Sequence, residues 1–383
     1  MMQYREFGNT GLKVSEIGLG CEGFAGKDEA FAVSLMDRAI AAGVNFVDIY
    51  TSDPEVRSHI GAALKGRREG FIIEGHVCSI WTDGQYKCSR KLDECKAAFA
   101  DLLERLGTDH IEIGMIHYID TSEEVDRIVD GPLFPWLKEL KAAGKIGHIG
   151  MSSHNPAAAL RAIERGLIEV LLFSTNPCYD LLPGTDDVEQ LWNPDNYSAV
   201  LTNMDPERQE LYETCSREGI GISVMKAFGG GDLLDDKLSP AGKALTPAQC
   251  LHYALTRPAV SVIACGAHSL DELESCLAYE SATDEERDYA AALASFPRIN
   301  WKGHCMYCGH CAPCPKKIDI ASVTKFLNLA KAQGCVPETV REHYKALPHH
   351  ASECQQCRAC ELRCPFGVEV TANMRDAYKI FGL

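Results

Sequence analysis

Short apolar segments alternate with amphipathic segments along most of the chain, and this alternation predicts β-strands separated by α-helices. A hairpin is expected first, over residues 4–18, with Asn9-Thr10-Gly11 as its turn. Eight further strands are predicted at Ile17–Gly20, Phe46–Ile49, Phe71–Glu74, Ile111–Ile116, His148–Ser152, Val170–Ser174, Ile222–Met225 and Ser261–Ala264. A strand–helix unit therefore recurs through the first three quarters of the protein.

Helix-ending and helix-starting signals agree with this division. Glycine follows several of the helical patterns, where a left-handed backbone ends a helix, at Gly43, Gly107, Gly144, Gly166 and Gly219. Asn155-Pro156 predicts an N-cap followed by proline at the first helical position, and Ser269-Leu270-Asp271-Glu272 fits a capping box. Eight units predict an α/β protein built on a (β/α)₈ TIM barrel. A doubly wound open sheet is the alternative, but no G-x-G-x-x-G motif follows the first strand.

The composition changes near Phe296-Pro297, where Cys, Pro and His become frequent. We expect a barrel over residues 1–295 and a small, mostly helical domain over 296–383, with helices near Ile320–Gln333 and Pro337–Ala346. Two long loops, Cys78–Lys91 and Asp180–Pro206, follow the third and sixth strands. They are predicted to lie over the C-terminal mouth of the barrel, where the active sites of such barrels are found.

Charge and cysteine content narrow the class of protein. A formal net charge of −16 disfavours nucleic acid and anionic membrane surfaces as partners. We see no signal peptide and no apolar run of membrane-spanning length. The 18 cysteines are therefore expected in a reducing compartment, the cytoplasm, where metal binding or catalysis explains them better than disulfides.

Eight of the cysteines form two runs. The second run, Cys354-x2-Cys357-x2-Cys360-x3-Cys364-Pro365, matches the bacterial [4Fe–4S] ferredoxin pattern. The first run, Cys305-x2-Cys308-x2-Cys311-x2-Cys314-Pro315, is one residue shorter before its last cysteine. These runs predict a ferredoxin-like domain that holds two [4Fe–4S] clusters.

In two-cluster ferredoxins, the fourth cysteine of each run binds the other cluster. Applied here, one cluster would be held by Cys305, Cys308, Cys311 and Cys364, and the other by Cys354, Cys357, Cys360 and Cys314. Zinc is the competing metal, since it also binds C-x2-C pairs. Two triplet-plus-one runs, each closed by Cys-Pro, favour clusters.

Several segments of the predicted barrel resemble the aldo-keto reductase family. The likeness runs from Tyr4–Ser15 and Ile17-Gly-Leu-Gly20 through Asn45-Phe-Val-Asp48 and Ile116-His117 to Gly150–Asn155 and Gly266–Leu270. The whole chain is similar to those members that carry a C-terminal ferredoxin-like domain. The resemblance implies a barrel that binds NADP(H) or NAD(H) and reduces carbonyl groups.

The family uses an Asp, a Tyr proton donor, a Lys and a His, and this chain preserves only part of that set. Asp48 matches the Asp and His117 matches the His. An ungapped comparison places Asp53 at the Tyr position and His76 at the Lys position. Tyr50 is a candidate replacement for the missing phenol, and Asp53 is equally well explained as an N-cap before Pro54. The resemblance thus predicts Asp48, Tyr50, Asp53, His76 and His117 as catalytic candidates.

Two further readings concern the barrel mouth. Asp48, His76 and His117 lie on three consecutive predicted strands, and one carboxylate with two imidazoles is also the composition of a metal site. For a nicotinamide cofactor, the resemblance implies Ser152, Ser153, Asn155 and Asn176 on the amide side, Gly266, His268, Ser269 and Glu272 on the adenosine side, and Lys226 near the pyrophosphate.

We therefore expect an iron–sulfur oxidoreductase that acts on a small carbonyl or hydroxyl compound, with electrons passing through two [4Fe–4S] clusters. A ferredoxin or another redox protein is an expected partner. The first alternative is an NAD(P)H-dependent carbonyl reductase whose clusters are structural. The second is an electron carrier or redox sensor built on a barrel without catalytic activity.

Overall fold

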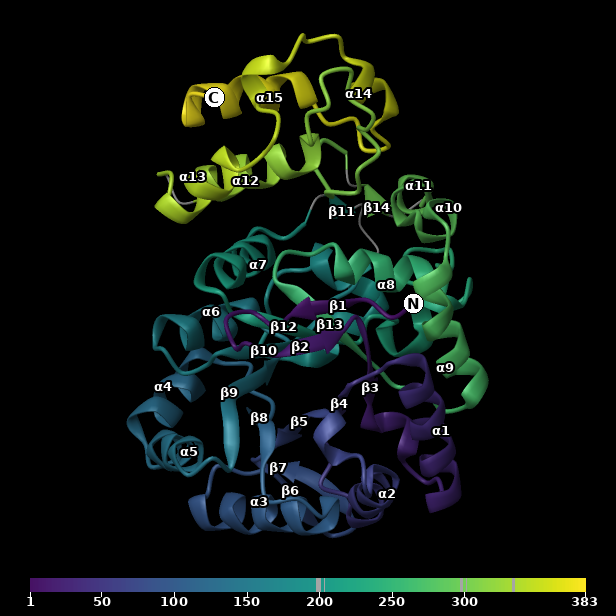
Figure 1. Cartoon of the computed structure of the whole chain (residues 1–383), viewed down its shortest axis with the longest axis vertical. Helices are drawn as coiled ribbons and strands as arrows, with labels where there is room; N and C mark the ends of the chain where they lie inside the picture. The colour runs from purple at the N-terminus through teal and green to yellow at the C-terminus, as the bar shows by residue number, and fades with distance from the viewer. Residues whose placement is uncertain (198–200, 203, 297–298, 301, 333–334) are drawn as a thin grey trace.

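Eight parallel strands close into a barrel in the computed structural model of the chain (Figure 1). The structure describes residues 1–383 except 198–200, 203, 297–298, 301 and 333–334. Around the barrel the strand order is β10-β12-β13-β3-β4-β5-β8-β9. Their bounds are β3 Ile17–Gly20, β4 Phe46–Ile49, β5 Ile72–His76, β8 Ile111–Ile116, β9 Ile146–Ser153, β10 Val170–Ser174, β12 Gly221–Met225 and β13 Val260–Cys265. The predicted TIM barrel is confirmed, and each predicted strand ends within two residues of its observed bounds.

Helices cover the outside of the barrel because each buries one apolar stripe against the strands. They are α1 Glu29–Ala42, α2 Pro54–Leu64, α3 Leu92–Leu106, α4 Ser122–Asp130, α5 Leu133–Ala142, α6 Pro156–Glu164, α7 Pro206–Glu218, α8 Pro247–Leu255 and α9 Leu270–Leu277. All five glycines predicted to end helices have positive φ angles. Asn155 caps α6 and Ser269 caps α9, as predicted. The Glu272 carboxylate, however, accepts the N–H of His268 rather than that of Ser269, so the predicted capping box is closed one residue earlier.

The predicted N-terminal hairpin, β1 Tyr4–Glu6 and β2 Lys13–Ser15, closes the end of the barrel at which the strands begin. Its Phe7 is fully buried with Phe46, Val170 and other inward side chains of the barrel. Gly8 has φ +56°, and a Cβ there would lie 2.4 Å from the Gly219 carbonyl oxygen. Glycine is therefore required where the hairpin meets the loop before β12.

The two long loops carry structure of their own. The first holds an antiparallel hairpin, β6 Ser79–Thr82 and β7 Gln85–Cys88. The second holds three short 3₁₀ turns and the strand β11 Leu201–Thr202. This strand pairs with β14 Ile299–Asn300, which leads into the C-terminal part of the chain.

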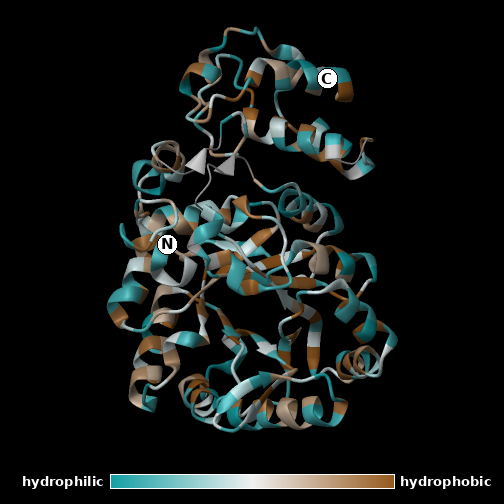
Figure 2. Cartoon of the chain, turned by 180° about the vertical axis from the view of Figure 1, so that it is seen from behind, coloured by the Kyte–Doolittle hydropathy of each residue, from teal (hydrophilic) through white to brown (hydrophobic). Residues whose placement is uncertain are grey.

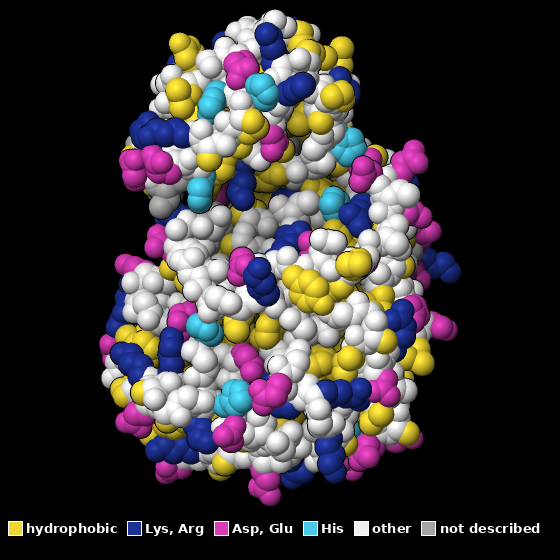
Figure 3. Space-filling view, in the orientation of Figure 1, with side chains coloured by type: hydrophobic (Ala, Val, Ile, Leu, Met, Phe, Trp, Pro, Cys, Tyr) yellow, Lys and Arg dark blue, Asp and Glu magenta, His cyan; other side chains and the backbone are white. Residues whose placement is uncertain are grey.

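The C-terminal part is mostly helical, with α12 Ile320–Ala332, α13 Glu338–Lys345, α14 Ala359–Arg363 and α15 Val370–Phe381. The predicted boundary at residue 295/296 directly precedes residues 297–298, which lie outside the described part. These helices form a second lobe beside the barrel, and the surface is hollowed between the lobes (Figure 3). Two short helices, α10 Asp284–Arg287 and α11 Tyr289–Ala294, precede this lobe in the chain.

The second lobe contacts the barrel through the first cysteine run. The Met306 carbonyl accepts hydrogen bonds from the Arg257 guanidinium at 2.8 Å and the Tyr289 hydroxyl at 2.9 Å. Arg257 precedes β13, so this contact lies toward the end of the barrel where strands begin. Brown, hydrophobic stretches follow the barrel strands in Figure 2. Among the described residues, no helix is long and apolar enough to cross a membrane.

Candidate active site and cysteine lobe

Three predicted site residues form a hydrogen-bonded chain at the C-terminal ends of neighbouring strands. Asp48 lies in β4, His76 ends β5 and His117 directly follows β8. The Asp48 Oδ1 is 3.0 Å from the His76 Nε2, and the His76 Nδ1 is 2.6 Å from the His117 Nδ1. All three side chains are buried. Because β4, β5 and β8 are adjacent in the barrel, residues far apart in sequence become one connected group.

A second buried carboxyl lies beneath this chain. Glu74 pairs with Asp48 in the register of β4 and β5, and both of its oxygens accept the Ser223 hydroxyl at 3.0 Å. Burial, and then the nearby Asp48, raises the pKa of Glu74 well above its ordinary value. Burial thus favours the protonated form of the Glu74 carboxyl, and Asp48 is the carboxyl that hydrogen-bonds to His76.

Asp48 dictates the tautomers of both imidazoles. A carboxylate only accepts hydrogen bonds, so its contact with the His76 Nε2 calls for a proton on that nitrogen. In a neutral His76 ring the Nδ1 is then the acceptor. The His117 Nδ1–H then donates to the His76 Nδ1. Burial lowers the pKa of His117 well below its usual range, so its ring is neutral and its Nε2 presents a lone pair. Among the described residues, this Nε2 forms no hydrogen bond.

Aromatic rings surround His117. Tyr50 lies nearly parallel to the His117 ring at 6.2 Å, and Tyr86 of the β6–β7 hairpin lies 5.8 Å away at 79°. Burial raises the pKa of Tyr50 far above that of an ordinary phenol, so Tyr50 stays protonated at neutral pH. The Arg90 guanidinium donates to the His117 and Tyr118 carbonyls at 2.8 and 2.7 Å. These contacts hold the loop after β8 in place.

Asp53 lies at the start of α2. Its Oδ1 accepts the N–H groups of Glu55 and Val56, with Pro54 at the first helical position. This is the helix-capping arrangement that the sequence offered as one of two explanations. The structure does not join Asp53 to the chain of Asp48, His76 and His117.

The suggestion of a metal ion between Asp48, His76 and His117 finds no support in this geometry. Both nitrogens of His76 already bond to the other two side chains. Within residues 1–197, 201–202, 204–296, 299–300, 302–332 and 335–383, no group of three or more His, Cys, Asp or Glu side chains is placed to hold a metal ion. This applies to the cysteine runs as well as to the barrel mouth. A hydrogen-bonded relay is the better description of this group.

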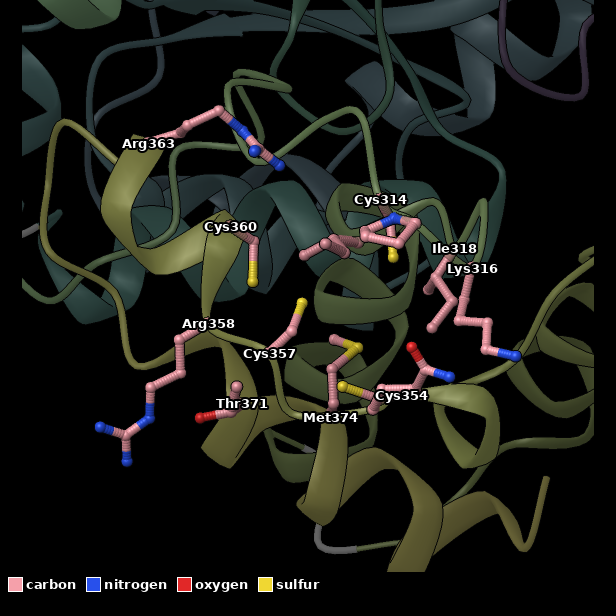
Figure 4. A pocket seen from close by; sticks show the side chains of 13 residues that line it. Cys314, Lys316, Ile318, Cys354, Cys357, Arg358, Cys360, Arg363, Thr371 and Met374 are labelled. Atoms are coloured by element: carbon pink, nitrogen blue, oxygen red, sulfur yellow. The ribbon is translucent and has the colours of Figure 1, made fainter.

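Four cysteines line one cavity in the second lobe. Cys314 of the first run and Cys354, Cys357 and Cys360 of the second surround a small cavity of about 20 Å³ (Figure 4). Their sulfur atoms point into this space, which Ile318 and Met374 also line. The Gln356 N–H lies 3.4 Å from the Cys354 Sγ. This grouping has the same members as the second crossed set of four inferred from sequence.

The other four cysteines are also drawn together. Burial raises the pKa of the Cys305 thiol to about 12, and the nearby thiols of Cys308, Cys311 and Cys364 add to the rise. Arg363, beside Cys364, donates to the carbonyls of Cys311 and Pro313 at 2.6 and 2.8 Å. The two runs are therefore tied to each other, and Cys364 lies with the first three cysteines of the other run.

The comparisons with known proteins were then decisive for the barrel. The sequence pattern of the Aldo/keto reductase family matches residues 16–244. This chain belongs to the aldo/keto reductase family. The matched region contains the barrel strands β3 to β12 and the three relay residues, and it ends before the cysteine runs.

Individual members of the family are related only distantly. The protein described as "Uncharacterized oxidoreductase YqkF" from Bacillus subtilis is 25% identical over 320 residues, covering 79% of this chain and 99% of that protein. "Aldo-keto reductase YhdN" of the same organism is 26% identical over 40% of this chain and 47% of its own length. The solved structure of "aldo-keto reductase AKR11C1 from Bacillus halodurans (holo form)" superposes with a TM-score of 0.59 at 24% identity, covering 76% of this chain and 95% of the other. That likeness concerns the fold.

An aldo/keto reductase barrel usually binds NAD(P)H. The amide-side residues expected here are mostly engaged in hydrogen bonds with other parts of the protein. Asn155 donates to the Asp120 carbonyl at 2.8 Å and to Asp186 at 2.9 Å. Asn176 donates to the Lys226 carbonyl and accepts the N–H groups of Cys178 and Tyr179. Ser153 donates to the Asp120 carboxylate at 3.0 Å, whereas the Ser152 hydroxyl oxygen accepts the Tyr118 N–H. Among the described residues, the Ser152 hydroxyl is given as an acceptor only, and the Asn176 amide donates to a single carbonyl.

The expected adenosine-side residues lie after β13. Gly266 is close to Glu22, since a Cβ at Gly266 would lie 3.5 Å from the Glu22 Cβ. His268, Ser269 and Glu272 form the cap of α9 described above. Lys226 follows β12 with φ +59°, and burial lowers its pKa while Glu22 and Asp120 oppose that change. The N-terminus of α9 is the part of this group that suits a phosphate.

Four residues of the mouth were not singled out from sequence. Glu74 reads as part of an apolar strand, Asp120 and Arg90 as loop residues, and Tyr86 as part of a long polar loop. Only the hairpin had a usable signal, Asp83-Gly84 between Trp81 and Tyr86, which is typical of a tight β-turn. The other three gain their role from neighbours on distant segments.

Proposed function

We propose that this protein is an iron–sulfur oxidoreductase of the aldo/keto reductase family that acts on a small carbonyl or hydroxyl compound at the barrel mouth. The observation that carries the proposal is the chain of Asp48, His76 and His117. It ends in an imidazole nitrogen with no partner among the described residues. The second lobe is proposed to hold two [4Fe–4S] clusters through which electrons pass.

His117 is the proposed proton-transferring residue. In its resting tautomer the Nε2 accepts the hydroxyl proton of a bound alcohol, and the Nδ1–H passes its proton to His76. His76 in turn donates to Asp48, so a positive charge on the imidazoles is stabilised by a carboxylate. In the opposite direction, protonated His117 donates to a developing alkoxide. The relay thus takes the place that a phenol and an ammonium group occupy in the family.

Tyr50 is proposed to position His117. Its ring is nearly parallel to the imidazole and stays neutral because burial raises its pKa. Asp53 remains a candidate only behind these residues, since its carboxylate already caps α2. This assignment makes His117 and its two partners the residues whose loss should stop turnover.

A nicotinamide, when bound, accepts or donates a hydride at the reacting carbon. Ser152 and the N-terminus of α9 at Ser269 suit its amide and phosphate groups, and Lys226 supplies a nearby positive charge. Ser153, Asn155 and Asn176 would contribute only after exchanging the internal bonds that they make in this structure. We therefore propose Ser152, Gly266, His268, Ser269, Glu272 and Lys226 as the first contacts to test.

The eight cysteines are proposed as the ligands of two [4Fe–4S] clusters, in the crossed sets given by Cys305, Cys308, Cys311 with Cys364 and by Cys354, Cys357, Cys360 with Cys314. Four sulfur atoms around one cavity suit a cluster, which takes four thiolates. Two backbone N–H groups also approach sulfur, at Cys354 and Cys364. Such hydrogen bonds are one of the ways in which proteins set cluster potentials.

The second candidate is an NAD(P)H-dependent carbonyl reductase whose clusters are structural. The hydrogen bonds of Met306 to Arg257 and Tyr289 favour it, because they place the first cysteine run near the end of β13 that lies away from the relay. Electron exchange with the site would then have to cross the barrel wall. A barrel without catalytic activity is disfavoured by the buried, oriented relay.

An anaerobic titration tests the proposal. Cluster-loaded protein is titrated with NADPH and then with NADH, while the visible absorbance of the clusters and the nicotinamide absorbance are followed together. Loss of cluster absorbance in step with nicotinamide oxidation supports electron flow between barrel and clusters. Turnover of a carbonyl compound with unchanged clusters supports the second candidate. If neither nucleotide binds and neither bleaches the clusters, a nicotinamide-dependent function is refuted.

A further inference from the structure

A second Asp–His pair lies beside the relay. His154 follows β9, the strand next to β8 in the barrel. Its Nδ1 is 3.0 Å from the Asp120 Oδ2, and its backbone N–H donates to the Asp120 Oδ1 at 2.6 Å. The Ser153 hydroxyl donates to the same oxygen at 3.0 Å. Asp120 is thus held by three groups and fixes the orientation of the His154 ring.

This pairing decides which nitrogen of His154 is an acceptor. The hydrogen bonds from Ser153 and from the His154 ring and backbone lower the pKa of Asp120, although burial opposes them. Burial lowers the pKa of His154, so its ring is neutral. An ionised Asp120 therefore accepts the His154 Nδ1–H, and the Nε2 carries a lone pair. This Nε2 is enclosed by protein and has no hydrogen-bond partner among the described residues.

The two unpaired acceptors are neighbours around the rim of the barrel. Tyr118 lies between them in the chain and in space, with ring centroids 6.3 Å from His117 and 5.3 Å from His154. Its side chain is only half-buried, and its φ of +54° lies in the region that side chains rarely adopt. The Tyr118 ring thus lies between the two imidazoles, close to both.

Buried acceptors without partners are rare in proteins and often mark binding sites. The His154 Nε2 is such an acceptor, because Asp120 binds the opposite edge of its ring. For His117 the opposite edge is bound by His76, which in turn bonds to Asp48. A ligand that satisfies both must bring two hydrogen-bond donors, spaced for adjacent strand ends. A small molecule with neighbouring hydroxyl groups has this chemistry, whereas a simple alcohol or ketone satisfies only one acceptor.

We infer that His154 is a specificity-determining residue that accepts a second hydroxyl group of the substrate, next to the hydroxyl or carbonyl group held by His117. The part played by His117 rests on the proposed function. The part played by His154 rests on its own contacts with Asp120 and on its position beside β8. Asp120 is the positioning residue that keeps the His154 Nε2 an acceptor.

The inference is tested by binding, which does not depend on turnover. Propan-2-ol, propane-1,2-diol and glycerol are titrated into the full-length, cluster-loaded protein, with saturation-transfer difference NMR as the readout. We expect the second hydroxyl to tighten binding by about 10- to 100-fold, the range of one hydrogen bond to a buried group. Equal affinity of the mono-alcohol and the diol for the native protein would overturn the inference.

Two variants assign the effect to His154. His154→Phe keeps an aromatic ring but removes the acceptor, so the preference for the diol should vanish while the mono-alcohol binds as before. Asp120→Asn keeps the imidazole but removes the fixed tautomer, so it should reduce the same preference. If His154→Phe does not fold, Asp120→Asn alone decides. An unchanged preference in a folded variant overturns the role of His154, and equal losses for both ligands indicate a structural role instead.

Failure here is distinguishable from failure of the proposed function. His117→Ala should lose turnover, yet the extra affinity contributed by the second hydroxyl should persist in it. If the native protein shows a diol preference that depends on His154 but no turnover, the binding role of His154 stands and the proposed enzymatic activity is refuted. Turnover that depends on His117, without a diol preference, would do the reverse.

Discussion

The candidate residues of the barrel mouth and those of the cysteine lobe differ in how far apart they lie in the sequence. In the lobe, six of the eight cysteines proposed as ligands fall in two short triplets, and Cys314 and Cys364 each follow within four residues. At the mouth, Asp48, His76 and His117 come from three strands and are 69 residues apart at the extremes, as their numbers give. A local motif can be recognised without a fold. The residues of a site at strand ends come together only when the barrel closes.

The two regions also differ in what neighbouring groups do. Around the relay, carboxylates orient imidazoles, so that each residue depends on the next. Around the cavity of the lobe, each cysteine is an equal contributor to one set of four. Single substitutions should therefore have graded effects at the mouth and all-or-none effects in the lobe.

The largest effect is expected from a cysteine in the lobe. Cys357→Ser removes one of the four proposed cluster ligands at the cavity. If the proposal holds, the protein should lose about half of its iron and sulfide, because one of two clusters would not assemble. Iron and acid-labile sulfide analysis measures this. Cys335→Ser, an exposed cysteine outside both runs, is the matched control and should keep full iron content. Full iron content in Cys357→Ser would exclude Cys357 as a ligand.

The next largest effect is expected at His117. His117→Ala removes the proton-transferring nitrogen, and kcat should fall by about 10²- to 10⁴-fold, the usual range for general acid–base catalysis. Steady-state kinetics with the best substrate found in the anaerobic titration measures it. Iron content should not change. His110→Ala, at a half-buried histidine paired with Asp109, should retain native kinetics. Native turnover in His117→Ala would remove the relay from the mechanism.

A smaller effect is expected from the far end of the relay. Asp48→Asn keeps the shape of the side chain but can donate to the His76 Nε2, so the tautomers of His76 and His117 are no longer fixed. We expect kcat to fall by about 10²-fold while KM changes little. A double variant with His117→Ala should show no further loss, because both residues act through one proton path. Additive losses would mean that Asp48 acts independently.

Glu74 should make the stability of the folded protein depend on pH. Its pKa is raised in the folded protein, so the folded state keeps a proton that the unfolded state releases above its ordinary value of 4.5. Stability should therefore fall as the pH rises from that value toward the raised pKa. Glu74→Gln should flatten this part of the profile, measured as the urea midpoint against pH. An identical slope in the variant would mean that Glu74 is not the group responsible.

The smallest effect is expected at Asp53. Asp53→Ala removes the N-cap of α2 and should lower the free energy of unfolding by about 1 kcal/mol. Asp53→Asn keeps an oxygen for the Glu55 and Val56 N–H groups and should restore most of that stability. Urea denaturation measures both. A large loss of turnover in Asp53→Asn would instead support a catalytic carboxylate at this position.

Much of the fold was predictable because its signals are local. The eight strands follow from short apolar runs, and the helix ends follow from glycine, proline and capping residues such as Asn155 and Ser269. The β6–β7 hairpin was predicted only as a loop. Its strands are short, and much of its surface is exposed, so it lacks the apolar pattern that marks the barrel strands.

The candidate site was predictable in part. Asp48, His76 and His117 were predicted as catalytic candidates from the family resemblance, and their places at the ends of barrel strands predicted that they lie near one mouth. Their hydrogen-bonded order was not predictable, since register and side-chain direction decide it. Asp53 illustrates the limit, because one sequence position suited both a catalytic acid and a helix cap. Only the position of the Glu55 and Val56 N–H groups shows which contact its carboxylate makes.

The sequence by itself determined the barrel and the two groups of cysteines, because strand periodicity and C-x2-C spacing are properties of neighbouring residues. The tertiary structure alone decided that His76 bridges Asp48 and His117, that Glu74 lies beneath them, and that Asp120 orients His154. These relations join strands that are distant in sequence and adjacent in the barrel. These hydrogen bonds form at about 3 Å only once the barrel has closed, and no local sequence pattern specifies them.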